Sequence, residues 1–277
     1  MHGGLIDRHL AWCQARGLRL RTISTRGYVL RRVERAISTP IAAATAEQLG
    51  RWYEHRGGAP SSRASELSHL RQFFGWMVLY DHRGDNPTAR LFRPRIPRLL
   101  PRPMPHNDLA VALASAPDRI RPWLLLAAFA GLRAQEIAYL RHEDIRQDLA
   151  VLIVHDGKGG DQRVIPLHPE VARALPRSGT GWVFPRRDGK PGPNQPWLVS
   201  HLTNRHLHSL GISATLHQAR HWFGTEIYRT SHDLRATQEL LGHKSPVVTA
   251  GYAAWNPVIG GEAVMALTIP DAVDVRS

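Results

Sequence analysis

The chain has 277 residues, enough for one large domain or two smaller ones, and its hydrophobic fraction of 43% is typical of a folded protein. Its formal charge of +13 comes almost entirely from arginine, which favours a partner that bears phosphate groups; solubility with a GC-rich coding bias explains the same charge equally well. With Cys13 as its single cysteine, the chain cannot form an internal disulfide or a zinc ribbon. No apolar run is long enough to predict a membrane span, and the first residues lack the apolar stretch of a secretory signal. We therefore expect a cytoplasmic protein.

Residues 1–92 predict a helical domain. Apolar residues recur at helical spacing over Leu5–Trp12, Tyr28–Val33 and Ser62–Tyr80, and Thr45–Gln48 is a capping box that predicts a helix start. Residues 1–100 contain 17 arginines and no lysine, against 7 acidic residues. A helical bundle with one strongly basic face is suited to clamp DNA, and a merely solvated helical surface is the alternative.

Composition changes abruptly at residues 93–105, which contain five prolines and four arginines. Proline restricts the backbone to extended conformations and cannot continue a helix, so this stretch predicts a stiff linker whose cations can follow a nucleic-acid backbone. We expect three parts: a helical core-type DNA-binding domain (1–92), the linker (93–105) and a catalytic domain (106–277).

The last of these parts begins with helical patterns. Asn107 and Asp108 predict a cap for a helix that runs to Leu113, and the apolar run Arg121–Ala130 predicts a second helix ended by Gly131. Arg133 opens a further helix that contains Glu136. Two short strands, Leu149–Val154 and Gln162–Leu167, flank a glycine-rich turn with Lys158 near its tip and predict a hairpin. Residues 176–196 predict a loop with a short strand at Trp182–Phe184, followed by a helix over Trp197–Leu210. The fold class is therefore mainly α with a small antiparallel β-sheet.

The stretch from Thr215 to Tyr252 has the strongest chemical signal. Thr215 and Gln218 form a capping box, so a helix should begin at Leu216 with His217 and Arg220 on one face of its first turn. Free backbone N–H groups and the positive end of the helix dipole favour an anion there, and an imidazole with a guanidinium suits a phosphate. A Gly242-His243 pair follows, and Tyr252 supplies an oxygen nucleophile.

This order of residues resembles the tyrosine recombinase (phage integrase) family. The matching strings are AGLRAQEIAYL, GKGG followed by RVIPL, LHQARHWFGT and LLGHKSPVVTAGY. The six matching positions are Arg133, Lys158, His217, Arg220, His243 and Tyr252. The basic helical first part is similar to the core-binding domain of the family. Ala253-Ala-Trp255 stands where the family often has another histidine. Because the sequence has no room before Leu5 for the arm-type domain of many phage integrases, we expect it to resemble the short two-domain members, Xer-type enzymes and simple integrases.

The resemblance implies metal- and ATP-independent breakage and rejoining of DNA strands. Tyr252 would attack the phosphodiester and form a 3′-phosphotyrosyl link, while Arg133 and Arg220 grip the non-bridging oxygens. Lys158 would protonate the leaving 5′-oxygen, helped by a pKa that neighbouring cations lower.

Two histidines and one carboxylate complete the implied site. His217 would act as acid or base near the tyrosine or bond a phosphate oxygen, His243 would donate to the phosphate, and Glu136 would orient another group of the site. No cofactor is expected. A second set of histidines, with H-x4-H-x-H spacing, lacks a supporting carboxylate and predicts no metal site. Its members and near neighbours are His201, His206, His208, His217 and His221.

The implied partners are double-stranded recombination sites, three further copies of the chain in a tetramer on paired sites, and accessory directionality or DNA-bending proteins; no membrane is expected. The protein would be associated with the nucleoid. Two alternatives remain open: a catalytically silent DNA-binding protein of the same fold, and a type IB topoisomerase, which shares the phosphotyrosine chemistry but acts as a monomer without site preference.

Overall fold

The computed structural model describes residues 4–97, 100–155 and 162–242, and the chain divides into two compact units, Met1–Arg98 and Leu99–Ser277. Each unit has its own hydrophobic core. The division falls inside the proline- and arginine-rich stretch 93–105. The end of that stretch already belongs to the second unit, because Met104 is buried in its core and donates its backbone N–H to the carbonyl of Gln218 at 3.0 Å.

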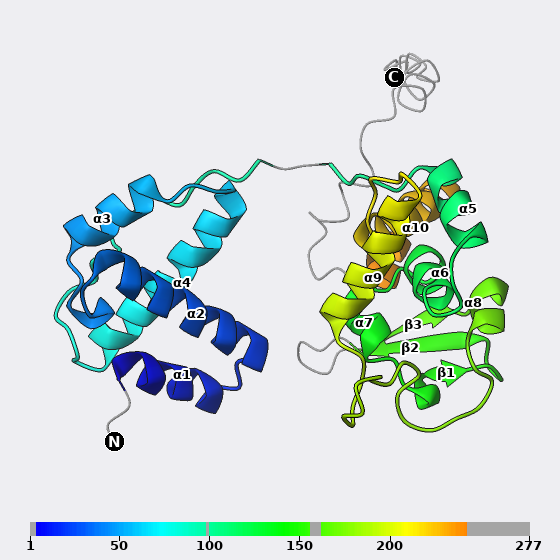
Figure 1. Ribbon diagram of the computed structural model, residues 1–277, viewed down its shortest axis with the longest axis horizontal. Helices are drawn as coiled ribbons and strands as arrows, with labels where there is room; N and C mark the ends of the chain where they lie inside the picture. Colours follow the sequence, from blue (N-terminus) through cyan, green and yellow to red (C-terminus); the bar gives the residue numbers. More distant parts are fainter. Residues whose placement is uncertain (1–3, 98–99, 156–161, 243–277) are drawn as a thin grey trace, which may run out of the picture. The chain divides into compact units, whose positions relative to one another are not determined.

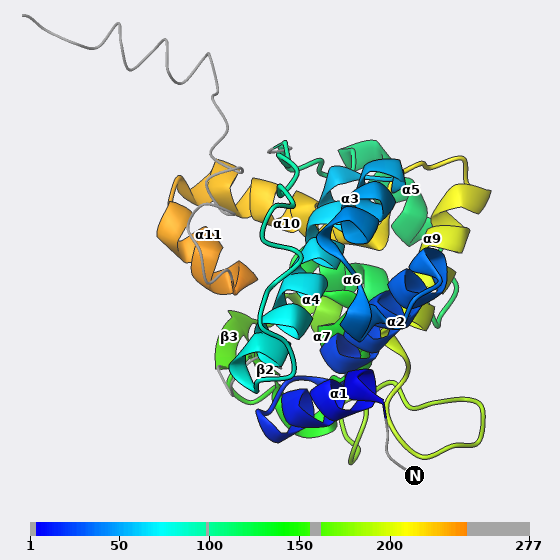
Figure 2. The same cartoon turned by 90° about the vertical axis from the view of Figure 1, so that its left-hand side faces the viewer.

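The first unit is a bundle of helices (Figure 2). Its main helices are α1 (Leu5–Ala15), α2 (Leu20–Ile37), α3 (Ala46–His55) and α4 (Pro60–Leu79), and α2 contacts the other three. The predicted capping box is present, since Thr45 and Gln48 exchange hydrogen bonds of 2.9 and 3.1 Å. The second helix begins at Leu20, earlier than the pattern from Tyr28 indicates, because the turn at Gly17 (φ +72°) suffices to end α1.

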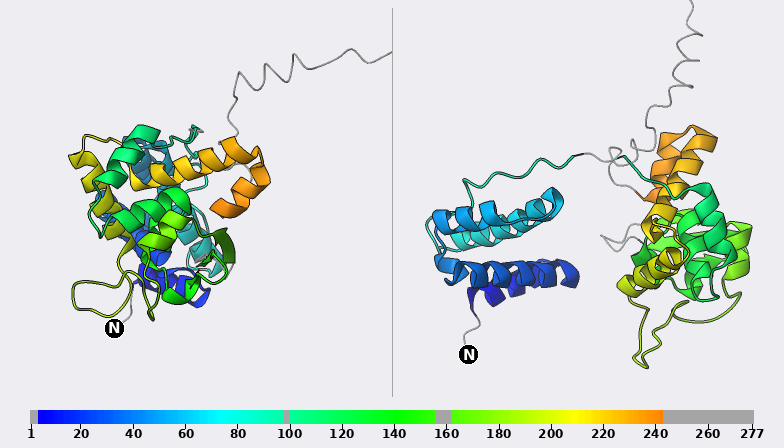
Figure 3. Two further views of the ribbon diagram at one scale, coloured as in Figure 1. Left: turned by 90° about the vertical axis from the view of Figure 1, so that its right-hand side faces the viewer. Right: turned by 45° about the horizontal axis from the view of Figure 1, so that its top comes forward.

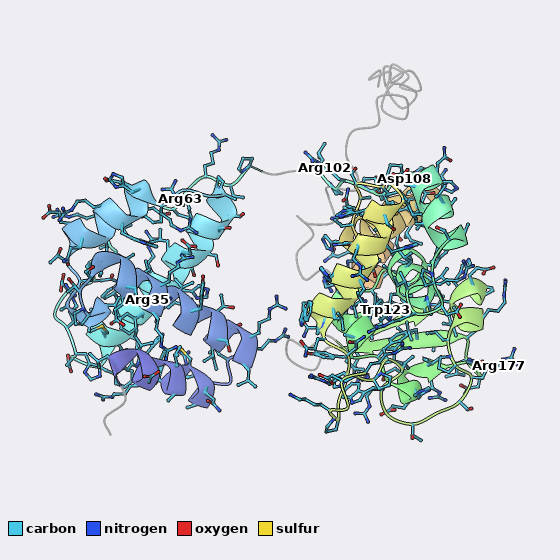
Figure 4. All side chains as sticks on the ribbon, in the orientation of Figure 1. Arg35, Arg63, Arg102, Asp108, Trp123 and Arg177 are labelled. Carbon is cyan, nitrogen blue, oxygen red and sulfur yellow. The ribbon has the colours of Figure 1, made fainter. Side chains whose placement is uncertain are left out.

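The second unit is built around α6 (Arg121–Phe129), which contacts five other helices (Figure 1). These are α5 (His106–Ala114), α7 (Ala134–Ala138), α8 (Pro169–Ala174), α9 (Pro196–Ser209) and α10 (Leu216–Ser231). A helix that is apolar on all sides belongs in an interior. Accordingly Trp123, labelled in Figure 4, is 1% exposed, and residues 124–128 are buried.

A three-stranded antiparallel sheet lies beside these helices, in the order β1 (Ile145–Arg146), β2 (Val151–His155), β3 (Gln162–Pro166). The predicted β2–β3 hairpin is confirmed, and its paired residues Leu152 and Ile165 are buried in the core. From the end of α10 the chain turns into α11 (Leu234–Leu241), which lies beside β3 (Figure 3, left).

The predicted fold class, mainly helical with a small antiparallel sheet, is confirmed, and α10 begins at Leu216 as predicted. Some details differ. The predicted strand Trp182–Phe184 forms only an isolated bridge from Trp182 to Arg141, and α5 begins at His106, so that Asn107 and Asp108 lie in its first turn rather than before it. Pro105 takes the capping position there, since its fixed φ suits a helix entry. Within the described part of the chain, none of the helices combines the length and the apolar character of a membrane span.

Candidate active site

The site includes Arg133 and Glu136, which lie at the start of α7. Arg133 caps this helix, and the Glu136 carboxylate turns back to accept the backbone N–H of Arg133 at 2.7 Å and its guanidinium at 2.8 Å. An acidic side chain three residues into a helix satisfies an N–H that the helix itself leaves unpaired. The Glu136 side chain is 7% exposed, whereas that of Arg133 is 38% exposed.

Arg163 reaches the same carboxylate from β3. Its two terminal nitrogens bond the two oxygens of Glu136, each at 2.9 Å, in a fork that matches the carboxylate geometry. Sequence reasoning missed this residue. The signal was the alternation of side chains along a strand. Arg163 lies two residues before the buried Ile165, so both side chains face the interior, and that of Arg163 is 10% exposed. Val164, between them, faces out.

Arg220 approaches Glu136 from α10, with 3.6 Å between its guanidinium and the carboxylate. Its side chain is 2% exposed. The guanidinium donates to the carbonyl of Gly131, at the turn between α6 and α7, and to the carbonyl of Leu241 at the end of α11. Arg220 therefore joins three segments that are distant in sequence.

The electrostatics of this cluster follow from one buried carboxylate among three guanidinium groups. Burial by itself raises the pKa of Glu136, but the hydrogen bonds and charge of Arg163, then the charge of Arg220 and the N–H of Arg133, outweigh burial and bring that pKa down to about 2. Glu136 is thus ionised at neutral pH. It balances one of the three positive charges, so the cluster presents a net positive field suited to an anion.

His217 lies in the first turn of α10, one turn before Arg220. Its ring packs edge-to-face on His221, with the centroids 4.5 Å apart. Burial, followed by the charges of Arg220 and Arg133, lowers the pKa of His217 below its ordinary 6.5, which places the imidazole within the field of both arginines. At neutral pH it is a neutral group that can accept a proton.

The expectation that the first-turn N–H groups of α10 are free for an anion is wrong for Leu216. Its N–H donates to the side chain of Asn204 on α9 at 2.9 Å, and the N–H of Thr215 donates to Gln218 at 3.0 Å. The capping box was visible in the sequence, but the contact of Asn204 depends on the packing of α9 against α10.

Among the described residues, Arg133 and Arg220 thus meet at Glu136, and the positive charges of these two arginines act on His217. The other three positions proposed from the sequence, Lys158, His243 and Tyr252, lie outside the described residues, as does the C-terminal stretch after them. Within the ranges that the structure describes, no three His, Cys, Asp or Glu side chains group in a way that could hold a metal ion.

The family model described as "Phage integrase family" matches residues 105–257, more than half of the chain. The chain therefore belongs to the phage integrase family.

Two curated relatives share substantial identity with the chain. Tyrosine recombinase XerA of Pyrococcus horikoshii is 32% identical over 180 residues, which cover 61% of this chain and 62% of the relative. Tyrosine recombinase XerC of Xanthomonas campestris pv. campestris is 34% identical over 220 residues, which cover 72% of this chain and 66% of the relative. The matched part is therefore less than two thirds of the length of either relative.

The fold also matches a solved structure, a lambda integrase tetramer bound to a Holliday junction, with a TM-score of 0.69 at 20% identity. That match covers 91% of this chain and 78% of the integrase. At this identity the likeness establishes a common fold.

Proposed function

We propose that the protein is a site-specific tyrosine recombinase that cleaves and rejoins DNA strands through a 3′-phosphotyrosyl intermediate. The observation that carries this proposal is the convergence of Arg133 and Arg220 on one carboxylate inside the family-matched region, beside a neutral histidine. The names of XerA and XerC, both tyrosine recombinases, support the same activity.

Cleavage of a phosphodiester without a metal ion requires fixed cations where negative charge develops. Arg133, with its half-exposed side chain, is suited to contact a non-bridging oxygen directly, and the buried Arg220 adds its positive charge from behind. A donor that contacts the oxygen directly, as proposed for Arg133, typically contributes about 10²–10³ in rate. Because the guanidinium groups are held by Glu136 and by helix carbonyls, little reorganisation is needed as the charge grows.

The remaining steps are assigned to residues that match the family positions. The hydroxyl oxygen of Tyr252 bonds to the phosphorus and gives its proton to the neutral His217, while the bond to the 5′-oxygen breaks and Lys158 protonates that oxygen. His243 donates a hydrogen bond to the phosphate. The phosphotyrosyl bond conserves the energy of the broken bond, so the 5′-hydroxyl of a second strand can attack it and restore a phosphodiester without ATP.

Duplex DNA with paired recombination sites is the proposed substrate, and a tetramer of this chain is the proposed assembly, by likeness to the lambda integrase tetramer bound to a Holliday junction. In this proposal residues 1–92 clamp the DNA, residues 93–105 link, and residues 106–277 carry the chemistry. Accessory directionality or DNA-bending proteins are further partners implied by the family. The proposed site of action is the nucleoid in the cytoplasm, for a chain of bacterial or phage origin.

A nicked suicide duplex tests the chemistry, because loss of the short fragment beside the nick traps the covalent complex. Wild-type protein should form a protease-sensitive protein–DNA adduct, and Tyr252→Phe should form none while binding DNA with unchanged affinity. Sequencing of the trapped DNA should return one site. If wild-type protein formed no adduct, the chain would be a catalytically silent DNA-binding protein. If it formed adducts without site preference and relaxed supercoils as a monomer, it would be a type IB topoisomerase.

The role of Lys158 has a separate test. Lys158→Ala should slow cleavage far more than DNA binding, because the leaving oxygen then lacks its acid. A substrate with sulfur in place of the bridging 5′-oxygen has a leaving group that needs no proton, so it should restore cleavage by this variant. Failure of that rescue would assign the proton to another group.

A further inference from the structure

The C-terminus of α11 is held by three arginines that come from three other places in the second unit. The last carbonyls of a helix have no partner within the helix and form the negative end of its dipole, so cations are favourable there. Each arginine takes a different carbonyl: Arg163 bonds Leu240 at 3.0 Å, Arg220 bonds Leu241 at 2.6 Å, and Arg133 makes a long contact of 3.5 Å with Gly242.

The same three arginines surround Glu136. The carboxylate and the helix end are thus two anionic anchors shared by one set of cations. A displacement of either anchor changes the position of all three guanidinium groups. The placement of Arg133 and Arg220, the two arginines proposed to act on phosphate, therefore depends on how Glu136 and α11 are fixed.

Every nitrogen of the Arg163 guanidinium is engaged by the protein. Its Nε donates to Leu240, and its two terminal nitrogens donate to the two oxygens of Glu136. The side chain is 10% exposed. A guanidinium in this state is not available to a substrate, and its planar fork fixes the angle between the two anchors.

The backbone at Gly242 confirms how closely the helix end lies against this side chain. Gly242 has φ +63°, and a Cβ built there would lie 2.9 Å from Nη1 and 3.2 Å from Cδ of Arg163. A glycine meets both constraints, the left-handed conformation and the close approach. Gly242, where the chain leaves α11, is therefore in direct contact with Arg163 and immediately precedes His243 in the sequence.

We propose that Arg163 is a positioning residue that sets the two catalytic arginines by holding Glu136 between them and by tying the end of α11 to β3. This inference rests on the proposed recombinase function. Without Arg163, Glu136 pairs more closely with Arg133 and withdraws it from the phosphate, and the end of α11 loses its link to the sheet. DNA binding does not depend on this link, because Arg163 is buried.

Single-turnover cleavage of the suicide duplex is the first measurement, on Arg163→Gln and Arg163→Lys. Both should cleave between about 10-fold and 100-fold more slowly than wild type, as is usual when the partner of a site residue is removed, with DNA affinity unchanged. Lysine should not rescue, since one ammonium cannot reach three acceptors. Arg146→Gln is the matched control: Arg146 lies on β1 of the same sheet, exposed and paired with Asp148, and its variant should cleave at the wild-type rate.

A double-mutant cycle with Glu136→Gln separates positioning from general damage. If Arg163 acts in part through Glu136, the double variant Arg163→Gln with Glu136→Gln should lose less cleavage rate than the product of the two single losses. Independent, multiplicative losses would overturn the proposal, as would wild-type cleavage by both Arg163 variants or rescue by lysine.

Amide hydrogen exchange over residues 234–242 gives a readout that needs no catalysis. Exchange should be faster in Arg163→Gln and in Arg163→Lys than in wild type and in Arg146→Gln, because the carbonyl of Leu240 loses its donor. Should wild type form no adduct, the recombinase proposal fails and this measurement still decides the anchoring of α11. Unchanged exchange in both Arg163 variants would overturn the positioning role.

Discussion

Glu136 is a carboxylate on which three arginines from different elements depend. Burial of a charge is costly unless it is paired and hydrogen-bonded, and removal of one partner from a buried set costs more than the set itself contributes. Here the carboxylate accepts from Arg133 and from both terminal nitrogens of Arg163. Its loss would leave three neighbouring guanidinium groups without their shared counter-charge.

Glu136 should therefore stabilise the second unit in a pH-dependent way. Its pKa is about 2 in the fold against an ordinary 4.5, so its stabilisation is complete above pH 4.5 and is lost as pH falls towards 2. The shift corresponds to about 3 kcal/mol. We expect Glu136→Gln to lower the free energy of unfolding by about that amount at pH 7, measured with urea, and the gap to wild type to narrow below pH 4.5. Glu170→Gln, which removes a more exposed partner of Arg173, should cost less than about 1 kcal/mol. If the difference in free energy of unfolding between wild type and Glu136→Gln did not change with pH, the lowered pKa of Glu136 could not be its source.

The pKa of His217 predicts the acid limb of the cleavage rate. Burial and the nearby arginines lower this pKa below 6.5, so His217 should become protonated, and lose its capacity to accept the tyrosine proton, only below pH 6.5. Single-turnover cleavage between pH 5 and 8 should be flat above 6.5 and fall below it, and His217→Asn should lack this limb. His221, with a pKa of about 4, titrates outside this range. A wild-type limb centred above 6.5 would argue against His217 as the acceptor.

At the scale of elements, the turn between α6 and α7 places two parts of the site. Gly131 has φ +62°, and its carbonyl accepts a hydrogen bond from Arg220. A Cβ built on it would lie 2.5 Å from Cδ1 of Phe223 on α10. The turn at Gly131 is thus packed closely against α10, the helix that carries Arg220.

Gly131→Ala should accordingly destabilise the second unit by about 2–4 kcal/mol, from the left-handed conformation together with the clash against Phe223. Gly211→Ala is the matched control, because Gly211 has φ +75° but no heavy atom within 4 Å of a Cβ, and it should cost about 1 kcal/mol. Urea unfolding of both variants measures the difference. Equal losses would mean that Phe223 moves aside freely.

Elements with local causes could be predicted from the sequence. The capping residues Thr45 and Thr215 predicted the starts of α3 and α10, and alternation around a glycine-rich turn predicted the β2–β3 hairpin. No local pattern predicts the contacts on which the arginines converge, since Arg163 meets Glu136 across 27 residues and Arg220 meets Gly131 across 89. Those contacts depend on how α7, β3 and α10 pack, which no local pattern encodes. Arg133 and Arg220 were expected in one site only through the family resemblance, and Arg163 was not expected there.

At the scale of the whole molecule, positive charge is concentrated in the first unit, but part of it is used internally. The buried Glu66 pairs with Arg32 and Arg56, and Arg83 pairs with Asp85. Other arginines of this unit, such as Arg35 in Figure 4, are exposed. The surplus therefore lies on the surface, where phosphate groups of DNA can replace water and counterions.

Salt dependence should report how many of these cations contact DNA. Arg93 and Arg95 are exposed in the proline-rich stretch, whose extended backbone can follow a strand. If each neutralises one phosphate, the double variant Arg93→Gln with Arg95→Gln should bind a duplex more weakly, and the slope of log K against log salt should become shallower by about 0.9 for each contact.

Arg177→Gln, in the exposed loop after α8, removes one of the surface charges and should leave the slope unchanged (Figure 4). Binding measured between 50 and 200 mM salt suffices, because that range changes affinity steeply for a protein with several phosphate contacts. A flat response of wild type, or an Arg177→Gln effect equal to one linker substitution, would mean that net charge rather than placed arginines governs binding.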